Sequence, residues 1–136
     1  MINITDQPIN INEVMAAATD TTAGAVNLFI GTVRDNALSK KVVRLEYEAY
    51  EEMAISETQK IFEEATGKYG LIRWSIAHRV GVLKPGDIAV AIAVSTKHRK
   101  ESFEASQFIM DELKAKVPIF KKEVFEDGEE WISAKL

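Results

Sequence analysis

The sequence predicts an α+β fold with a mainly antiparallel sheet, hairpins and about three helices, in a single domain over residues 1–136. Three observations lead to this prediction. Helical patterns alternate with pairs of strand patterns, not with single strands. Turn residues lie between the paired strands. No internal repeat or low-complexity linker divides the chain.

The first elements are a short strand at residues 2–4 and a helix at residues 8–19, for which Asn10 is the expected N-cap. Residues 24–33 are nearly all apolar, which predicts a strand buried on both faces. Gly24 and Gly31, inside that strand, indicate a bulge or a close backbone approach.

Residues 42–50 alternate between apolar and polar side chains, which is typical of a half-buried strand. We expect this strand to form a hairpin with residues 24–33 across the polar loop at residues 35–41. A helix should follow at residues 51–69, because apolar positions recur on one side and glycines stand near its expected end.

The C-terminal half should contain four strands and one long helix. Residues 84–87, Lys-Pro-Gly-Asp, are a strong turn signal, and Pro118 should end the helix at about Lys116. Ser95 or Thr96 is the expected cap of that helix. The strands are predicted at residues 72–80, 88–94, 119–125 and 131–134, the last two joined by a turn at 126–129.

Composition excludes several classes of site. The chain has no cysteine, so it has no disulfide and no thiolate metal site or nucleophile. It has no apolar run of about 20 residues and no visible signal peptide, and we expect a cytoplasmic protein. The formal charge is −4, yet basic residues gather at residues 97–100 and 114–122. This pattern favours a small anionic ligand over a polyanion.

Lys114 and Lys121 flank Pro118, with Lys114 on the last turn of a helix and Lys121 on the strand that follows. A sharp corner of this kind can point both ammonium groups into one cavity. The alternative is structural: lysines complement the dipole at a helix C-terminus and protect sheet edges.

Other cations stand at the ends of elements. Arg34 follows the apolar strand at residues 24–33, and its alternative role is an ion pair with Asp35 or Glu46. His98 and Arg99 begin a helix, where backbone N–H groups already favour anions; the alternative is a solvated helix start.

His78 is interpreted as a core residue, and Asp111 with Glu112 as solvated or paired carboxylates. No metal site is expected, since paired histidines and cysteines are lacking.

Several motifs, in this order along the chain, resemble the large, catalytic subunit family of molybdopterin synthase. They are Phe29 to Arg34, Leu45 to Tyr50 with Met53-Ala54, His78 to Gly81, His98-Arg99, Phe103 to Ala105, Leu113-Lys114, Pro118 to Glu123, and Gly128 to Trp131. The resemblance covers nearly the whole chain and implies an α/β-hammerhead-like fold.

The resemblance also implies a function. Members of this family take sulfur from the C-terminal Gly-Gly thiocarboxylate of a small ubiquitin-like subunit. They transfer it to cyclic pyranopterin monophosphate, which gives the dithiolene of molybdopterin. The large subunits form a homodimer, with one small subunit at each end of a heterotetramer. No metal or cofactor of the protein's own is implied.

Residue by residue, the resemblance implies catalytic roles for Lys114 and Lys121. It implies substrate binding by Arg34, His98 and Arg99, of which the last two can come from the other chain of the dimer. The remaining substrate-binding residues that it implies are Phe29, Met110 and, as a weaker match, Lys135.

The chain departs from the family at Ala37-Leu38-Ser39, where an Asn-x-Gly turn is frequent, and at Phe120, where tryptophan is frequent. It also lacks a longer C-terminal tail that some members carry. The alternative function is a non-catalytic receptor for a ubiquitin-like Gly-Gly tail. A nucleic-acid binder is disfavoured by the sequence pI of about 5.3.

Overall fold

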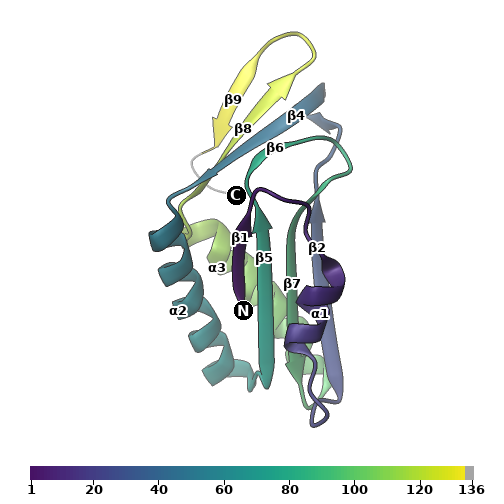
Figure 1. Ribbon diagram of the computed structural model, residues 1–136, viewed down its shortest axis with the longest axis vertical. Coiled ribbons are helices and arrows are strands. Elements are labelled where there is room, and N and C mark those ends of the chain that lie inside the picture. The colour runs from purple at the N-terminus through teal and green to yellow at the C-terminus, as the bar shows by residue number, and fades with distance from the viewer. Residues whose placement is uncertain (134–136) are drawn as a thin grey trace.

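The computed structural model describes residues 1–133 and contains two sheets and three helices in an elongated arrangement (Figure 1). One sheet has the order β1-β5-β7-β2, in which only the β1–β5 pair is parallel. The predicted α+β class with a mainly antiparallel sheet is confirmed. The strands of this sheet are β1 (Ile2–Thr5), β5 (Arg73–Arg79), β7 (Ile88–Thr96) and β2 (Ala25–Thr32).

The second sheet lies at one end of the molecule and is built around β4. Strand β4 pairs with β8 on one side and with β3 and β6 on the other, and β9 pairs with β8. Its strands are β3 (Asn36–Ala37), β4 (Lys40–Ala49), β6 (Gly81–Leu83), β8 (Ile119–Phe125) and β9 (Glu130–Ser133). The short strands β3 and β6 were not predicted from the sequence.

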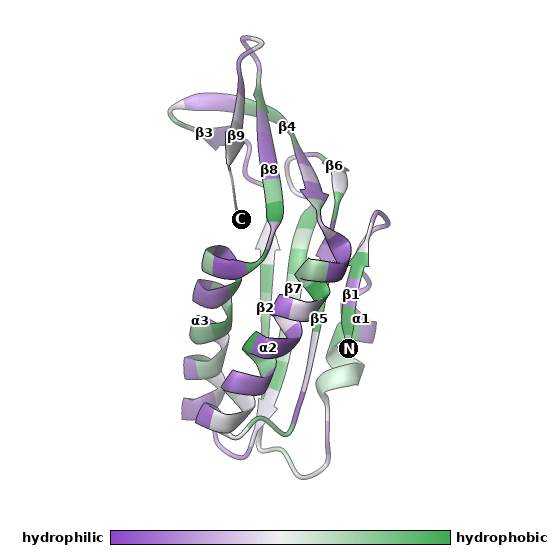
Figure 2. Ribbon diagram, turned by 90° about the vertical axis from the view of Figure 1, so that its left-hand side faces the viewer, coloured by the Kyte–Doolittle hydropathy of each residue, from purple (hydrophilic) through white to green (hydrophobic). Residues whose placement is uncertain are grey.

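The first sheet is covered by helices on both faces, and side-chain size separates the two faces. Helix α1 (Ile11–Ala18) packs against Ala77, Ala91 and Ala93, whose small side chains let the helix approach the sheet closely. Helices α2 (Glu51–Tyr69) and α3 (Arg99–Lys116) cover the other face, which carries larger residues such as Ile76, Ile92 and Val94. Figure 2 shows the hydrophilic sides of α2 and α3 turned away from the sheet.

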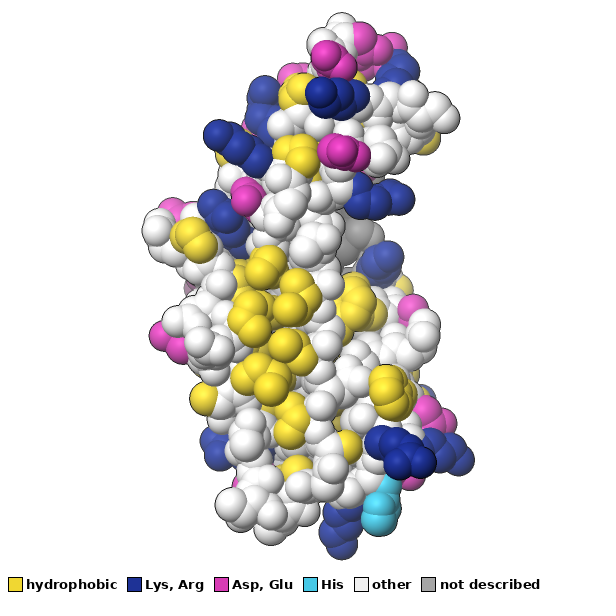
Figure 3. All heavy atoms as spheres, turned by 90° about the vertical axis from the view of Figure 1, so that its right-hand side faces the viewer, with side chains coloured by type: hydrophobic (Ala, Val, Ile, Leu, Met, Phe, Trp, Pro, Cys, Tyr) yellow, Lys and Arg dark blue, Asp and Glu magenta, His cyan; other side chains and the backbone are white. Residues whose placement is uncertain are grey.

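Strand β2 does not match the prediction of a strand buried on both faces. It is an edge strand, and Val26, Phe29 and Ile30 remain 37–39% exposed. Figure 3 shows hydrophobic side chains gathered on the face of the molecule that carries β2 and α1. The two glycines behave as predicted, since a bulge follows Gly31 and a Cβ at Gly24 would overlap the carbonyl oxygen of Lys97.

The predicted hairpin between residues 24–33 and 42–50 is wrong. Strand β2 pairs with β7, whereas β4 belongs to the second sheet. Pairing between sequence-distant strands buries both apolar sides of β7, which an isolated hairpin of β2 and β4 could not do.

The predicted caps and ends of the helices are mostly confirmed. Asn10 caps α1 by accepting a hydrogen bond from the Glu13 N–H at 3.2 Å, and Gly70, the C-cap that follows α2, adopts a left-handed conformation. Pro118 follows the end of α3 at Lys116, as predicted.

The cap predicted for α3 is wrong. Thr96 and Ser95 are buried in β7, and His98 occupies the N-cap position without a side-chain hydrogen bond to the helix. The Thr96 hydroxyl instead donates to the His98 carbonyl at 2.6 Å. The first N–H groups of α3 therefore receive no side-chain cap from His98.

The turn between β3 and β4 adopts a conformation that its residues do not favour. Leu38 and Ser39 have φ angles of 52° and 60°, as in a type I′ hairpin turn, where Asn-Gly is preferred. We expect Leu38→Asn with Ser39→Gly to raise the free energy of unfolding by about 1 kcal/mol, because the left-handed strain is relieved. Urea denaturation measures it, with Leu38→Ala/Ser39→Ala as the control; equal midpoints for both variants would contradict the explanation.

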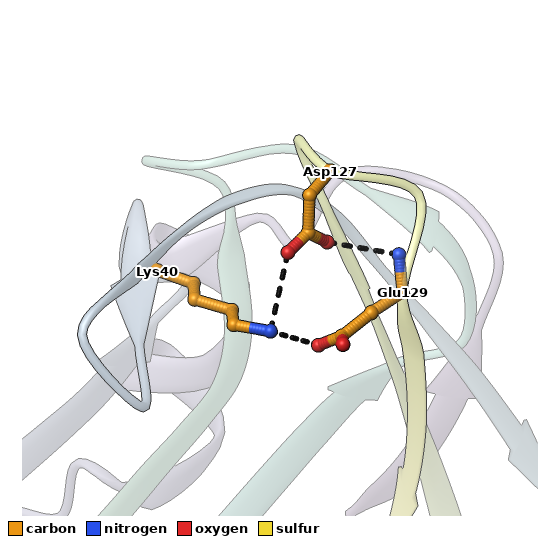
Figure 4. Close-up of polar contacts among 3 residues, drawn as sticks. All are labelled: Lys40, Asp127 and Glu129. Carbon is orange, nitrogen blue, oxygen red and sulfur yellow. Dashed lines mark hydrogen bonds and ion pairs between the residues drawn. The ribbon is translucent and has the colours of Figure 1, made fainter.

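Lys40 joins this turn to the tip of the β8–β9 hairpin (Figure 4). Its ammonium forms ion pairs with Asp127, at 3.1 Å, and with Glu129. The hydrogen bonds that the ammonium donates to Glu129 and Asp127 raise the pKa of Lys40. The pKa of the Asp127 carboxyl is lowered by the hydrogen bond that it accepts from the Glu129 backbone N–H, and by its hydrogen bond with Lys40. Because all three groups are exposed, this clamp contributes little to stability.

No helix within residues 1–133 is both long enough and apolar enough to cross a membrane.

Candidate functional site

Helix α3, from its second turn to its last, and the middle of β2 form a hollow of about 460 Å³ that contains Lys114. Phe29 and Met110, both predicted to line the site, lie in the wall of this hollow. The apolar wall lowers the local dielectric constant, which strengthens the interaction of an ammonium group with an anion. The remaining lining residues are Asn27, Leu28, Phe103, Ser106, Gln107 and Asp111.

Lys114 is exposed and forms no ion pair with any carboxylate of residues 1–133. Its neighbour Lys116, on the same last turn of α3, behaves differently: it pairs with Glu112 at 2.6 Å. The dipole of α3 acts on both lysines. Of these two lysines, only Lys114 lines a hollow, and only its ammonium group has no ion-pair partner within the described chain.

Lys121 lines two hollows of the second sheet, of about 440 Å³ and about 90 Å³. Arg34 shares the smaller one with Lys121, so the structure brings these two predicted residues together. The ammonium of Lys121 lies 3.2 Å from a carboxylate oxygen of Glu123, two residues along β8. An anionic ligand at Lys121 would therefore compete with Glu123.

Arg34 forms no ion pair within residues 1–133, so the structural alternative considered for it is not observed there. Glu46, one of the two expected partners, pairs instead with Arg44 at 3.0 Å. Arg34 is thus an uncompensated cation at the end of β2.

The predicted cations do not all converge within one chain. Lys114 and Lys121 line separate hollows, contrary to the expectation of a single cavity. His98 and Arg99 stand at the N-terminus of α3, about 22 Å along the helix axis from Lys114. They also lie beside the start of β2, whereas Arg34 follows its end, about 23 Å away along the strand.

His78 is a buried residue at the junction of the two sheets, as its structural interpretation predicted. Its side chain is 3% exposed, and its Nδ1 lies 2.9 Å from the Arg79 carbonyl oxygen. Its ring meets that of Tyr47 edge-on, with centroids 5.3 Å apart. Burial lowers the pKa of His78 to about 4, so the imidazole is neutral at pH 7.

Tyr47 lines both hollows that contain Lys121, and sequence reasoning missed it. The alternating pattern of β4 assigned Tyr47 to the apolar side, which is correct for its ring. Only the register of β4 and β8, which places Tyr47 opposite Lys121, reveals its relation to the lysine.

Lys135 lies outside the described residues. Within residues 1–133, no group of three or more histidine, aspartate or glutamate side chains is arranged to hold a metal ion.

The fold and the site together define an α+β protein with unpaired cations around partly apolar hollows. Comparison with known proteins identifies the family. The family model described as MoaE protein matches residues 4–116. The molybdopterin synthase catalytic subunit of Bacillus subtilis is 46% identical over 98% of this chain and 85% of its own length. The human catalytic subunit is 40% identical over 96% of this chain and 70% of its own.

A solved structure agrees with the sequence comparison. The crystal structure of molybdopterin synthase from Staphylococcus aureus superimposes with a TM-score of 0.91 at 39% identity, covering 96% of this chain and 95% of the other. The chain belongs to the MoaE family, that of the molybdopterin synthase catalytic subunits. The resemblance found in the sequence motifs is confirmed, and with it the prediction of an enzyme subunit in molybdenum cofactor biosynthesis.

Proposed function

We propose that this chain transfers sulfur from the thiocarboxylated C-terminus of a small ubiquitin-like partner to cyclic pyranopterin monophosphate, forming the dithiolene of molybdopterin. The observation that carries the proposal is Lys114, an unpaired cation within the described chain, in a hollow walled by Phe29 and Met110. The thiocarboxylate and the substrate phosphate are both anions, and fixed cations can bind them without a metal.

Lys114 and Lys121 have electrostatic roles in this proposal. As the bond between the acyl carbon and sulfur is cleaved, negative charge develops on the acyl oxygen. An ammonium group held close to that oxygen stabilises the transition state more than the ground state. Because the two lysines line separate hollows, each is proposed to act on a different part of the bound tail and substrate. The sulfur arrives on the partner, so the chain requires no cysteine of its own.

The active site is proposed to be shared between two chains of a homodimer, with one small subunit at each end. In one chain, His98 and Arg99 lie beside the start of β2 and Arg34 lies past its end. A twofold axis near the middle of β2 would bring the start of this strand in one chain close to its end in the other. The exposed apolar side chains of this edge strand support such a contact.

Mixing two inactive variants tests whether the site is shared. Arg99→Ala and Lys114→Ala should each be inactive alone. In a mixed dimer with shared sites, one site contains both substitutions and the other site contains neither. Random exchange of chains should therefore restore about a quarter of wild-type activity. If the mixture stays inactive although mass spectrometry detects mixed dimers, the pocket belongs to a single chain.

The proposed reaction itself is tested by reconstitution. The chain is mixed with a thiocarboxylated small subunit and cyclic pyranopterin monophosphate, and molybdopterin is measured by fluorescence after oxidation. Product formation is expected only with the thiocarboxylate, and a carboxylate-ended partner serves as the control. Binding of the partner without product would instead favour the non-catalytic receptor. A cytoplasmic location and a single domain over residues 1–136 stay predictions.

A further inference from the structure

Tyr47 occupies a position in the second sheet that its apolar packing does not explain. In the register of β4 and β8, it stands directly opposite Lys121, so both side chains project from the same face. Opposed residues on antiparallel strands have Cβ atoms about 4.5–5.5 Å apart. On its other side, Tyr47 pairs with Gly81 of β6, which has no side chain to occupy the neighbouring space.

The hydroxyl of Tyr47 forms no hydrogen bond with any of residues 1–133. Phenol groups that are partly buried usually find a partner. Tyr47 lines both hollows beside Lys121, and the smaller one also contains Arg34 and Glu123. An unpaired donor in such a place is suited to a ligand that supplies an acceptor oxygen.

The ring of Tyr47 is held in place from behind. His78 meets it edge-on at an interplanar angle of 76°, and His78 is itself fixed by its hydrogen bond with the Arg79 carbonyl. A buried aromatic contact of this kind restricts the ring before any ligand arrives, which is the preorganisation that electrostatic catalysis requires.

We propose that Tyr47 is a further catalytic residue of the sulfur transfer, donating a hydrogen bond to the acyl oxygen of the partner's tail beside Lys121, with His78 as its positioning residue. This inference rests on the proposed function. In the step concerned, the tail is joined to the pterin through sulfur as a thioester. Water adds to the acyl carbon, and negative charge moves onto the acyl oxygen.

The carbon–sulfur bond then breaks, and its electron pair leaves with sulfur on the pterin. The tail is released as a carboxylate, and the two protons of water pass to the thiolate and to solvent. No oxidant or reductant takes part. Tyr47 keeps its proton throughout: burial, followed by the charge of Glu123, raises the pKa of Tyr47 to about 12, so the phenol is a donor at neutral pH.

The test compares Tyr47→Phe with wild type in single-turnover sulfur transfer, and measures partner affinity by calorimetry. Tyr47→Phe keeps the ring and its contact with His78 but removes the donor. We expect the rate to fall on the order of 10²-fold with the Kd for the partner unchanged. Tyr50→Phe is the matched control, because it removes a hydroxyl from an exposed tyrosine, and its rate should stay at the wild-type value.

A second comparison tests the positioning role of His78. His78→Leu should slow the wild-type enzyme but cause no further loss in the Tyr47→Phe background, since its effect passes through the hydroxyl. Equal losses in both backgrounds would reduce His78 to a structural residue and overturn that part of the proposal.

The outcomes separate this inference from the proposed function. A wild-type enzyme that converts the substrate, with Tyr47→Phe within threefold of it, overturns the role of Tyr47 and leaves the proposed function intact. The same holds if Tyr47→Phe weakens partner binding but leaves the rate at saturation unchanged. A wild-type chain that forms no product with a competent partner overturns both.

Discussion

Lys114→Ala should lower the single-turnover rate of sulfur transfer by about 10²- to 10³-fold, the typical cost of removing one electrostatic group that stabilises charge in a transition state. The expectation rests on two features of the structure. The Lys114 ammonium has no carboxylate partner within residues 1–133, and the hollow around it is lined by Phe29, Phe103 and Met110. Its charge is therefore available to a ligand that enters the hollow.

Lys116→Ala is the matched control, because it removes the same charge from the same last turn of α3. Lys116 already pairs with Glu112 and lines none of the hollows described above. Both substitutions change the interaction with the helix dipole similarly. Lys116→Ala should thus retain nearly the wild-type rate. A Lys114→Ala enzyme within a few-fold of wild type would contradict the assignment of Lys114.

Local chemistry allowed the helices to be predicted well. The bounds of α2 were predicted as observed, because a 3.6-residue apolar pattern and Gly70 are both local signals. Pro118 similarly marked the end of α3. The wrong cap arose because β7 continues to Thr96: a threonine before a helix pattern can serve equally as the last residue of a buried strand.

Strand pairing could not be predicted, since it depends on contacts distant in sequence. The apolar run of β2 fits a central strand, yet that strand is an edge whose apolar side chains remain partly exposed in the single chain. A sequence alone does not say whether another chain covers such a strand. The same limitation affected the site, since Lys114 and Lys121 are close in sequence but face different hollows.

The register between β4 and β8 is the clearest case of information that the sequence did not contain. Alternation in residues 42–50 correctly placed Leu45 and Tyr47 on one face of β4, but it wrongly placed Val43 there, because a bulge between Val42 and Arg44 buries Val42 and leaves Val43 exposed. It could not tell that the face with Tyr47 would also carry Lys121 and Glu123 from β8. A shift of one residue in the register would have placed Tyr47 on the opposite face from the lysine.

His78 should make the protein sensitive to mild acid. Its pKa is about 4 in the folded chain and about 6.5 when the chain is unfolded, because burial disfavours the imidazolium. Between these values the unfolded state binds a proton that the folded state does not, so the free energy of unfolding falls as the pH falls. The free energy of unfolding should decrease by about 2 kcal/mol from pH 7 to pH 5, and by about 3 kcal/mol from pH 7 to pH 4.

Urea denaturation at several pH values measures this loss, and pH 5 to 6.5 is the decisive window because most carboxylates titrate below it. His78→Leu should flatten the dependence on pH in this window, even if it is less stable at every pH. His98→Gln is the matched control, because it replaces the other histidine of the chain, which is exposed, and leaves His78 in place. If His78→Leu and wild type lost stability in parallel, His78 would not be the group that titrates.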